Sequence, residues 1–99
     1  MARQLPAAWQ EWLKNRSTIT FADFQYTPKC AQVTAGSSVT FQGDFTSHPL
    51  SETCGPVDAI PHTASGTDLS VTFTTTGIYG YQCDIHFGAG MVGAIQVVQ

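Results

Sequence analysis

The residues best suited to chemistry lie near the carboxyl end of the chain. Cys83 and His86 are separated by two residues, and Met91 follows after four more, across Gly88-Ala89-Gly90. The glycines allow the backbone to turn sharply, so one tight loop could present a thiolate, an imidazole and a thioether. These soft and borderline ligands suit copper, because together they leave neither oxidation state of the metal with its fully preferred geometry.

A copper site of this kind needs a second imidazole, and two histidines are candidates for it. His48 is the stronger candidate, because it follows the strand pattern of residues 39–45 and would lie in a loop at one end of the fold. His62 is the rival, although a solvated loop histidine is the commoner interpretation of such a residue. The sequence therefore favours His48, Cys83, His86 and Met91 as the metal ligands.

Other chemistry is compatible with parts of this set. One cysteine with two histidines can bind zinc tetrahedrally, although the methionine argues against zinc. Cys83 alone could be a buried core thiol. It could also be a nucleophile with His86 as its base, but these neighbouring turn residues lack an orienting acid and an evident substrate cleft. The spacing favours the metal site over each alternative.

The elements that must position these residues are mostly β-strands. Apolar and polar residues alternate over residues 38–42 and 69–74, and Tyr79, Tyr81 and Cys83 share one phase. The pattern predicts an all-β, two-sheet antiparallel sandwich of about 6–8 strands. The phase changes near Asp23, which indicates a bulge or bend. The irregular residues 47–67 form the longest predicted connection, a common place for functional residues.

The amino-terminal part of the chain has a different pattern. Residues 1–17 are interpreted as an extension that precedes a β domain of residues 18–99. Ala8, Trp9, Trp12 and Leu13 are spaced so that they share one helical face, which predicts a short helix over residues 7–15.

Composition excludes several classes of partner. The 99 residues suit a single domain, and the net charge of −3 with only four Lys and Arg gives no basic surface for nucleic acid. The sequence has no run of about 18 or more apolar residues, so no membrane span is expected.

The segment around the candidate ligands resembles a known family. Residues 77–97, Gly77-Ile-Tyr-Gly-Tyr-Gln-Cys83-Asp-Ile-His86-Phe-Gly-Ala-Gly-Met91-Val-Gly-Ala-Ile-Gln-Val97, are similar to the closing segment of plastocyanin-like cupredoxins. Residues 33–41 resemble the second and third strands of that family, and His48 falls where its first histidine ligand lies. The resemblance covers residues 18–99 and implies a Greek-key β-sandwich with the cupredoxin fold.

The resemblance also implies one type 1 (blue) copper ion cycling between Cu+ and Cu2+. His48, Cys83 and His86 would bind it in a trigonal plane, with Met91 as the axial ligand. The implied function is to carry single electrons between larger redox partners, without enzymatic activity. The alternative is a protein that binds or delivers copper without rapid redox cycling.

The resemblance places the electron port at the copper-binding imidazole. Redox proteins are expected to dock on a monomer at an apolar face around His86, formed by Pro49, Leu50, Phe87 and Ala89. Plastocyanins carry a tyrosine just before the cysteine and acidic clusters near it. This chain has Gln82 and scattered acids, so docking to photosynthetic partners is not expected.

The residue after the first histidine departs from the family pattern. The family usually has Asn there, with a backbone N–H donated to the copper thiolate, whereas Pro49 has no N–H. We therefore expect the sulfur to lack one hydrogen bond. A thiolate with fewer donors is more electron-rich and favours oxidised copper.

Cys30 and Cys54 are additional to the family pattern. With Cys83 committed to metal they form an even pair, and a disulfide between them is the preferred interpretation, with two separate thiols as the alternative. The bond would stabilise the fold by roughly 3 kcal/mol. It requires an oxidising compartment, so we expect export to the periplasm, with the cell surface or thylakoid lumen as alternatives. An export signal would then have been left out of this sequence.

Overall fold

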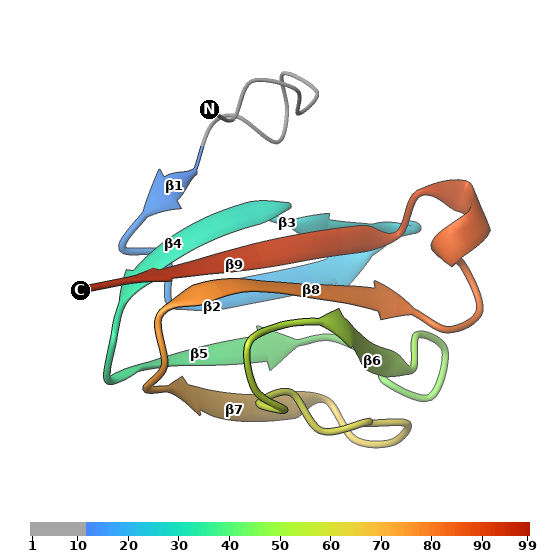
Figure 1. Cartoon of the computed structure of the whole chain (residues 1–99). Helices are drawn as coiled ribbons and strands as arrows, with labels where there is room; N and C mark the ends of the chain where they lie inside the picture. Colours follow the sequence, from blue (N-terminus) through green and yellow to red (C-terminus); the bar gives the residue numbers. More distant parts are fainter. Residues whose placement is uncertain (1–11) are drawn as a thin grey trace.

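The alternating sequence patterns correspond to strands that each bury one side. The structure is a computed structural model that describes residues 12–99 (Figure 1). These residues form nine strands and one 3₁₀ turn: β1 (Leu13–Lys14), β2 (Thr18–Ala22), β3 (Gln25–Thr27), β4 (Cys30–Thr34), β5 (Ser37–Gln42), β6 (Leu50–Cys54), β7 (Asp68–Phe73), β8 (Gly77–Cys83), η1 (Phe87–Ala89) and β9 (Val92–Val98).

The strands form two sheets packed face to face. One sheet has the order β1-β4-β9-β8-β6 and the other β3-β2-β5-β7. The expected sandwich is confirmed, but it has nine strands among the described residues and not the predicted 6–8. Its purely antiparallel character is also wrong, because β1 with β4, β4 with β9, and β2 with β5 run parallel. The chain crosses between sheets from β3 to β4 and returns at β5 beside β2. Such crossovers leave no trace in the alternation of side chains.

The core is the space between the two sheets. The apolar residues of the predicted alternating segments are buried, except for the partly buried Leu69: Val39, Phe41, Val71, Phe73, Tyr79, Tyr81 and Cys83. The core also contains Ile19, Phe21, Ile95 and Val97. Tyr81 packs edge-on against Tyr26 and Phe41, with ring centroids 4.8 and 5.2 Å apart. Aromatic rings therefore fill the core beside the strand that ends at Cys83.

The predicted amino-terminal helix is wrong over its described part. Leu13 and Lys14 form β1, which pairs with Ala31 and Gln32 of β4. The N–H of Asn15 also donates to the Gln32 carbonyl at 2.9 Å. Backbone hydrogen bonds to a sheet edge thus override the helical spacing of the apolar side chains. Residues 7–11 of that prediction lie outside the described residues.

The long predicted connection contains a strand. Residues 50–54 form β6, which pairs antiparallel with β8 and has an irregular register between Glu52 and Cys54. The Glu52 carboxylate accepts hydrogen bonds from the N–H groups of Ala59 and Ile60, each at 2.9 Å. The irregular parts are therefore residues 47–49 and 55–67. The second is held against β6 by this carboxylate and by two backbone hydrogen bonds between Leu50 and Thr63.

The predicted disulfide between Cys30 and Cys54 is wrong. None of the three cysteines is in a disulfide. The ladders pair Cys30 with Ala94, Ala94 with Gly80, and Gly80 with Cys54. Three strand spacings of about 4.8 Å separate the two cysteines by about 14 Å. Bridged Cα atoms lie about 4.4–6.8 Å apart, so the bond cannot form in this fold.

Alkylation will test the state of the cysteines. We expect the metal-free protein, denatured without reductant, to take up three alkyl groups per chain in mass spectrometry. Prior reduction should leave this number unchanged. Uptake of one alkyl group without reductant and of three after reduction would show that Cys30 and Cys54 do form a disulfide.

The close contact of Gly93 with Tyr81 gives a stability prediction. A β-carbon at Gly93 would lie 2.5 Å from the Tyr81 hydroxyl oxygen and 2.6 Å from the ring carbon that bears it. Since Tyr81 is only 1% exposed and cannot move aside, Gly93→Ala should lower the unfolding free energy by about 1–3 kcal/mol. Urea denaturation of the metal-free protein measures this. Gly88→Ala is the matched control, because a β-carbon there meets nothing within 4 Å.

Candidate metal centre

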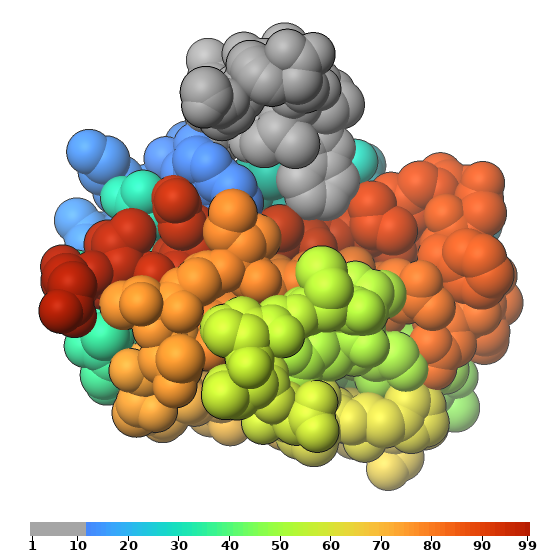
Figure 2. All heavy atoms as spheres, in the orientation of Figure 1, coloured from blue at the N-terminus to red at the C-terminus, as the bar shows by residue number. Residues whose placement is uncertain are grey.

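A closed loop at one end of the sandwich carries three of the predicted ligands. β8 ends at Cys83 and β9 begins at Val92, at the opposite end of β9 from the carboxyl terminus (Figures 1 and 2). The N–H of Cys83 donates to the Met91 carbonyl at 3.0 Å, and the N–H of Met91 donates to the His86 carbonyl at 3.2 Å. Gly90 closes the turn with φ of 92°, a conformation that favours glycine. This loop, residues 84–91, is called the metal loop below, and it is held by its own backbone hydrogen bonds.

A second loop brings His48 to the same place. Leu50 of β6 pairs with Cys83 of β8, and the N–H of Asp84 donates to the Pro49 carbonyl at 2.9 Å. On its other side, the N–H of His48 donates to the Asp44 carbonyl at 3.0 Å. Pairing between β6 and β8 thus positions a histidine 35 residues away from the cysteine.

Three donor atoms converge on one point. The His48 Nδ1 and His86 Nδ1 atoms lie 3.1 Å apart, and they lie 3.7 and 3.6 Å from the Cys83 Sγ. A point equidistant from the three atoms is about 2 Å from each, close to the bond lengths of about 2.0–2.3 Å that nitrogen and sulfur make with zinc, a comparable metal. Cys83 is fully buried, and both histidines are part-exposed. The donor set and its spacing fit a single metal ion.

Met91 and His62 differ in their relation to this cluster. Met91 is fully buried and is joined to both Cys83 and His86 by backbone hydrogen bonds. His62, the rival candidate, lies outside the three-donor group, and its Nε2 is 3.0 Å from a carboxylate oxygen of Asp84. His62 thus contacts the residue after the cysteine instead of joining the donors.

Asp84 connects the metal loop to β6 and to residues 55–67. Its carboxylate accepts a hydrogen bond from the Ser51 hydroxyl at 2.9 Å in addition to its contact with His62. Desolvation acts to raise the pKa of Asp84, but hydrogen bonds from Ser51, Gln82 and His62 lower it on balance. The negative charge is therefore held close to the metal donors.

Two tyrosine hydroxyls are buried near the site without a hydrogen-bond partner among the described residues, on Tyr26 and Tyr81. Burial raises the pKa of both side chains, and the charges of Cys83 and Asp84 add to the effect on Tyr26. Both phenols therefore stay neutral, so they bring no charge to the thiolate.

One residue at the site was not predicted from the sequence. The ring of Phe24 lies against the imidazole of His86, with centroids 4.5 Å apart and planes tilted by 56°. Phe24 and Asp23 have φ of 65° and 52° and form the two-residue turn between β2 and β3. The left-handed region costs a residue other than glycine roughly 1–2 kcal/mol. The phase change near Asp23 was the only signal, and it indicated a bend without a role.

Comparison with known proteins identifies the family. The family model described as copper binding proteins, plastocyanin/azurin family, matches residues 14–98. The chain belongs to this family. The copper predicted from the ligand types is thus the metal of the family, and the three-donor cluster is where the chain could hold one ion.

Individual relatives agree with this assignment. The chain is 34% identical over 85 residues to chloroplastic plastocyanin of Hordeum vulgare, covering 73% of this chain and 54% of that protein. It is 36% identical over 84 residues to plastocyanin of Prochlorothrix hollandica, covering 73% and 62%. The match thus spans little more than half the length of these relatives. A reduced amicyanin variant shares the fold, with a TM-score of 0.65, 24% identity, and coverage of 84% of this chain and 82% of that one.

The Pro49 position gives a prediction about the reduction potential. No backbone N–H of the described residues donates to the Cys83 sulfur, and Pro49 has none to give. Pro49→Asn and Pro49→Ala both supply an N–H that stabilises the electron-rich thiolate of the reduced site. Each should raise the potential by roughly 40–60 mV, the one-electron equivalent of a hydrogen bond of about 1–1.4 kcal/mol.

Protein-film voltammetry measures this potential. Pro61→Ala, at an exposed position within residues 55–67, is the control and should leave the potential unchanged. A potential that stays fixed or falls in both Pro49 variants would contradict the role given to the missing N–H.

Proposed function

We propose that this protein carries single electrons through one copper ion held by His48, Cys83, His86 and Met91. The observation that supports the proposal best is the convergence of two imidazole nitrogens and one cysteine sulfur around a single point. Met91 is proposed as the axial ligand because it is buried and tied to Cys83 and His86. Copper bound there supplies a one-electron change of oxidation state.

The surrounding chain suits a carrier better than an enzyme. The thiol of Cys83 is fully buried, and the loops that bear the ligands are fixed by backbone hydrogen bonds. Donors that stay in place in both oxidation states keep the reorganisation on electron transfer small. We therefore propose that no substrate is transformed at this site.

The proposed electron port is the apolar surface around His86. Ile85, Phe87 and Phe24 are 60%, 53% and 52% exposed, an unusual concentration of large apolar side chains on one end of a small protein. Leu50, expected on this surface, is fully buried and does not contribute, whereas Phe24 and Ile85 do. A redox partner with an apolar patch could approach the imidazole edge of His86 here.

The oligomeric state and the cellular compartment are also part of the proposal. We propose a monomer that works outside the cytoplasm, with the periplasm as the leading compartment. Because the disulfide is absent, this location now depends on the family alone. Within residues 12–99, no helix is long and apolar enough to cross a membrane.

Adding Cu(II) to the purified metal-free protein tests the proposed function. We expect an intense thiolate-to-copper charge-transfer band toward the red end of the visible spectrum, and narrow copper hyperfine splitting in the paramagnetic spectrum. Cys83→Ser should abolish the band, and His62→Ala should retain it because His62 lies outside the donor cluster. A folded protein that shows no such band would contradict the assignment.

Voltammetry separates the carrier from the alternative of copper delivery. A reversible one-electron wave from the blue protein supports the carrier. A colourless Cu(I) form that passes copper to a chelating partner but shows no reversible wave would instead support delivery.

A further inference from the structure

The turn between β2 and β3 has an unfavourable sequence for its shape. Ala22 pairs with Gln25, so Asp23 and Phe24 alone make the connection, and both have positive φ. Two-residue turns of this conformation favour Asn or Asp first and glycine second. A bulky aromatic residue at the second position is strained, and such strain persists where surrounding contacts determine it.

The contact that accompanies this strain is with the metal donors. The Phe24 ring lies 4.5 Å from the ring of His86 and 6.5 Å, edge-on, from the ring of His48. Its other side is open, since the residue is 52% exposed. Phe24 therefore shields part of both imidazoles from solvent.

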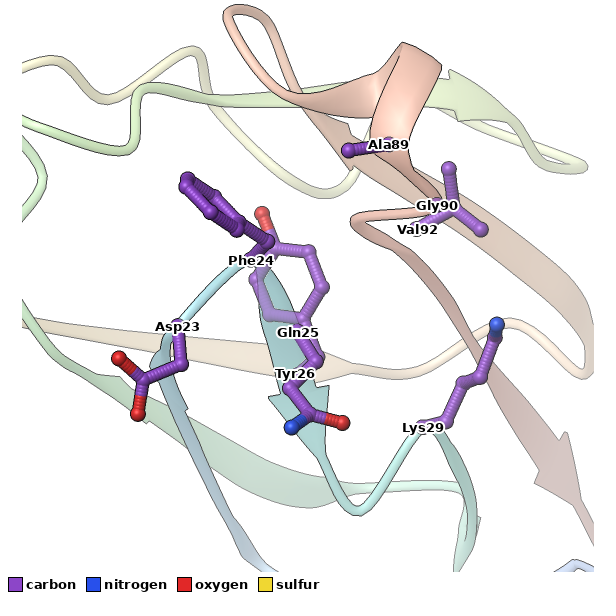
Figure 3. Close-up of a pocket in the computed structure, with 8 residues that line it drawn as sticks. All are labelled: Asp23, Phe24, Gln25, Tyr26, Lys29, Ala89, Gly90 and Val92. Atoms are coloured by element: carbon purple, nitrogen blue, oxygen red, sulfur yellow. The ribbon is translucent and has the colours of Figure 1, made fainter.

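The metal loop faces open space on this side. A cavity of about 480 Å³ separates the β2–β3 turn from the loop, with Asp23 and Phe24 on one side and Ala89 and Gly90 on the other (Figure 3). Because this space is open, the Phe24–His86 contact is a bridge from the hairpin to the loop. Without Phe24, the His86 ring would keep its contacts with His48 and Cys83 but would lose its support from the β2–β3 hairpin. It would then be freer to rotate about its side-chain bonds.

We propose that Phe24 is a positioning residue that holds the His86 ring in its metal-binding orientation, and that the strained turn is retained for this contact. The inference depends on the proposed copper site. An aromatic contact adds attraction beyond the area it buries, and a fixed ring loses less conformational freedom on binding metal. The contact thus slows release of copper from the His86 side.

Phe24→Gly separates this role from a structural one. Glycine is the favoured residue at this turn position, so the urea midpoint of the metal-free variant should not fall below that of the parent. The loss of copper to an excess of chelator should nevertheless become about three- to tenfold faster, the range expected for one aromatic pair. In NMR spectra of the metal-free protein, the carbon-bound ring protons of His86 should lose the shift imposed by the Phe24 ring.

Two further variants complete the test. Asp23→Gly relaxes the other strained residue but keeps the aromatic ring, so it should release copper at the parental rate. Phe24→Tyr should also retain that rate, because the ring is preserved. The positioning role would be overturned if Phe24→Gly released copper at the parental rate. It would also be overturned if Asp23→Gly accelerated release as much as Phe24→Gly does. A parent that forms no charge-transfer band would overturn the copper site as well, so the two failures are distinguishable.

Discussion

The structure depends on the antiparallel pairing of β6 with β8. Leu50 and Cys83 are partners in that ladder, and the next hydrogen bond, from Asp84 to the Pro49 carbonyl, extends it into the two loops. This backbone contact sets the distance between His48 and the cysteine. A shift of one residue in the register would turn Cys83 away from the core and separate the three donors.

The sandwich around this pairing restricts the site to one arrangement. Cys83 continues the buried side of β8 after Tyr79 and Tyr81, so packing of these rings fixes the direction of the thiol. The two loops then add the imidazoles from the end of the sandwich. The Cys83 sulfur is enclosed by the packed core, whereas the two histidines are part-exposed, where a partner could contact them.

The sequence predicted those features that depend on local spacing. Cys83 and His86 could be predicted as donors because one short loop carries them, whereas the role of Met91 as a ligand remains a prediction. The buried strands could be predicted because apolar and polar side chains alternate. The parallel strand pairs could not be predicted, because they depend on which sheet each strand joins. The Cys30–Cys54 disulfide failed for the same reason, since counting cysteines ignores the two strands that lie between them. Leu13 shared the helical spacing of Ala8, Trp9 and Trp12, but pairing with the edge of a sheet supplied backbone partners for Leu13 and Lys14.

The wide separation of the ligands along the chain has a consequence for folding. A metal ion bound to both His48 and Cys83 is a cross-link across 35 residues, and it restricts the unfolded chain as the missing disulfide would have done. Loop-closure entropy for such a span is worth roughly 3–4 kcal/mol if the link is permanent. Unlike a disulfide, this link is governed by mass action, so native stability rises with the concentration of free metal. The stability of the folded chain therefore depends on whether copper is bound. Chains that never acquire copper unfold more often and are the most exposed to proteolysis.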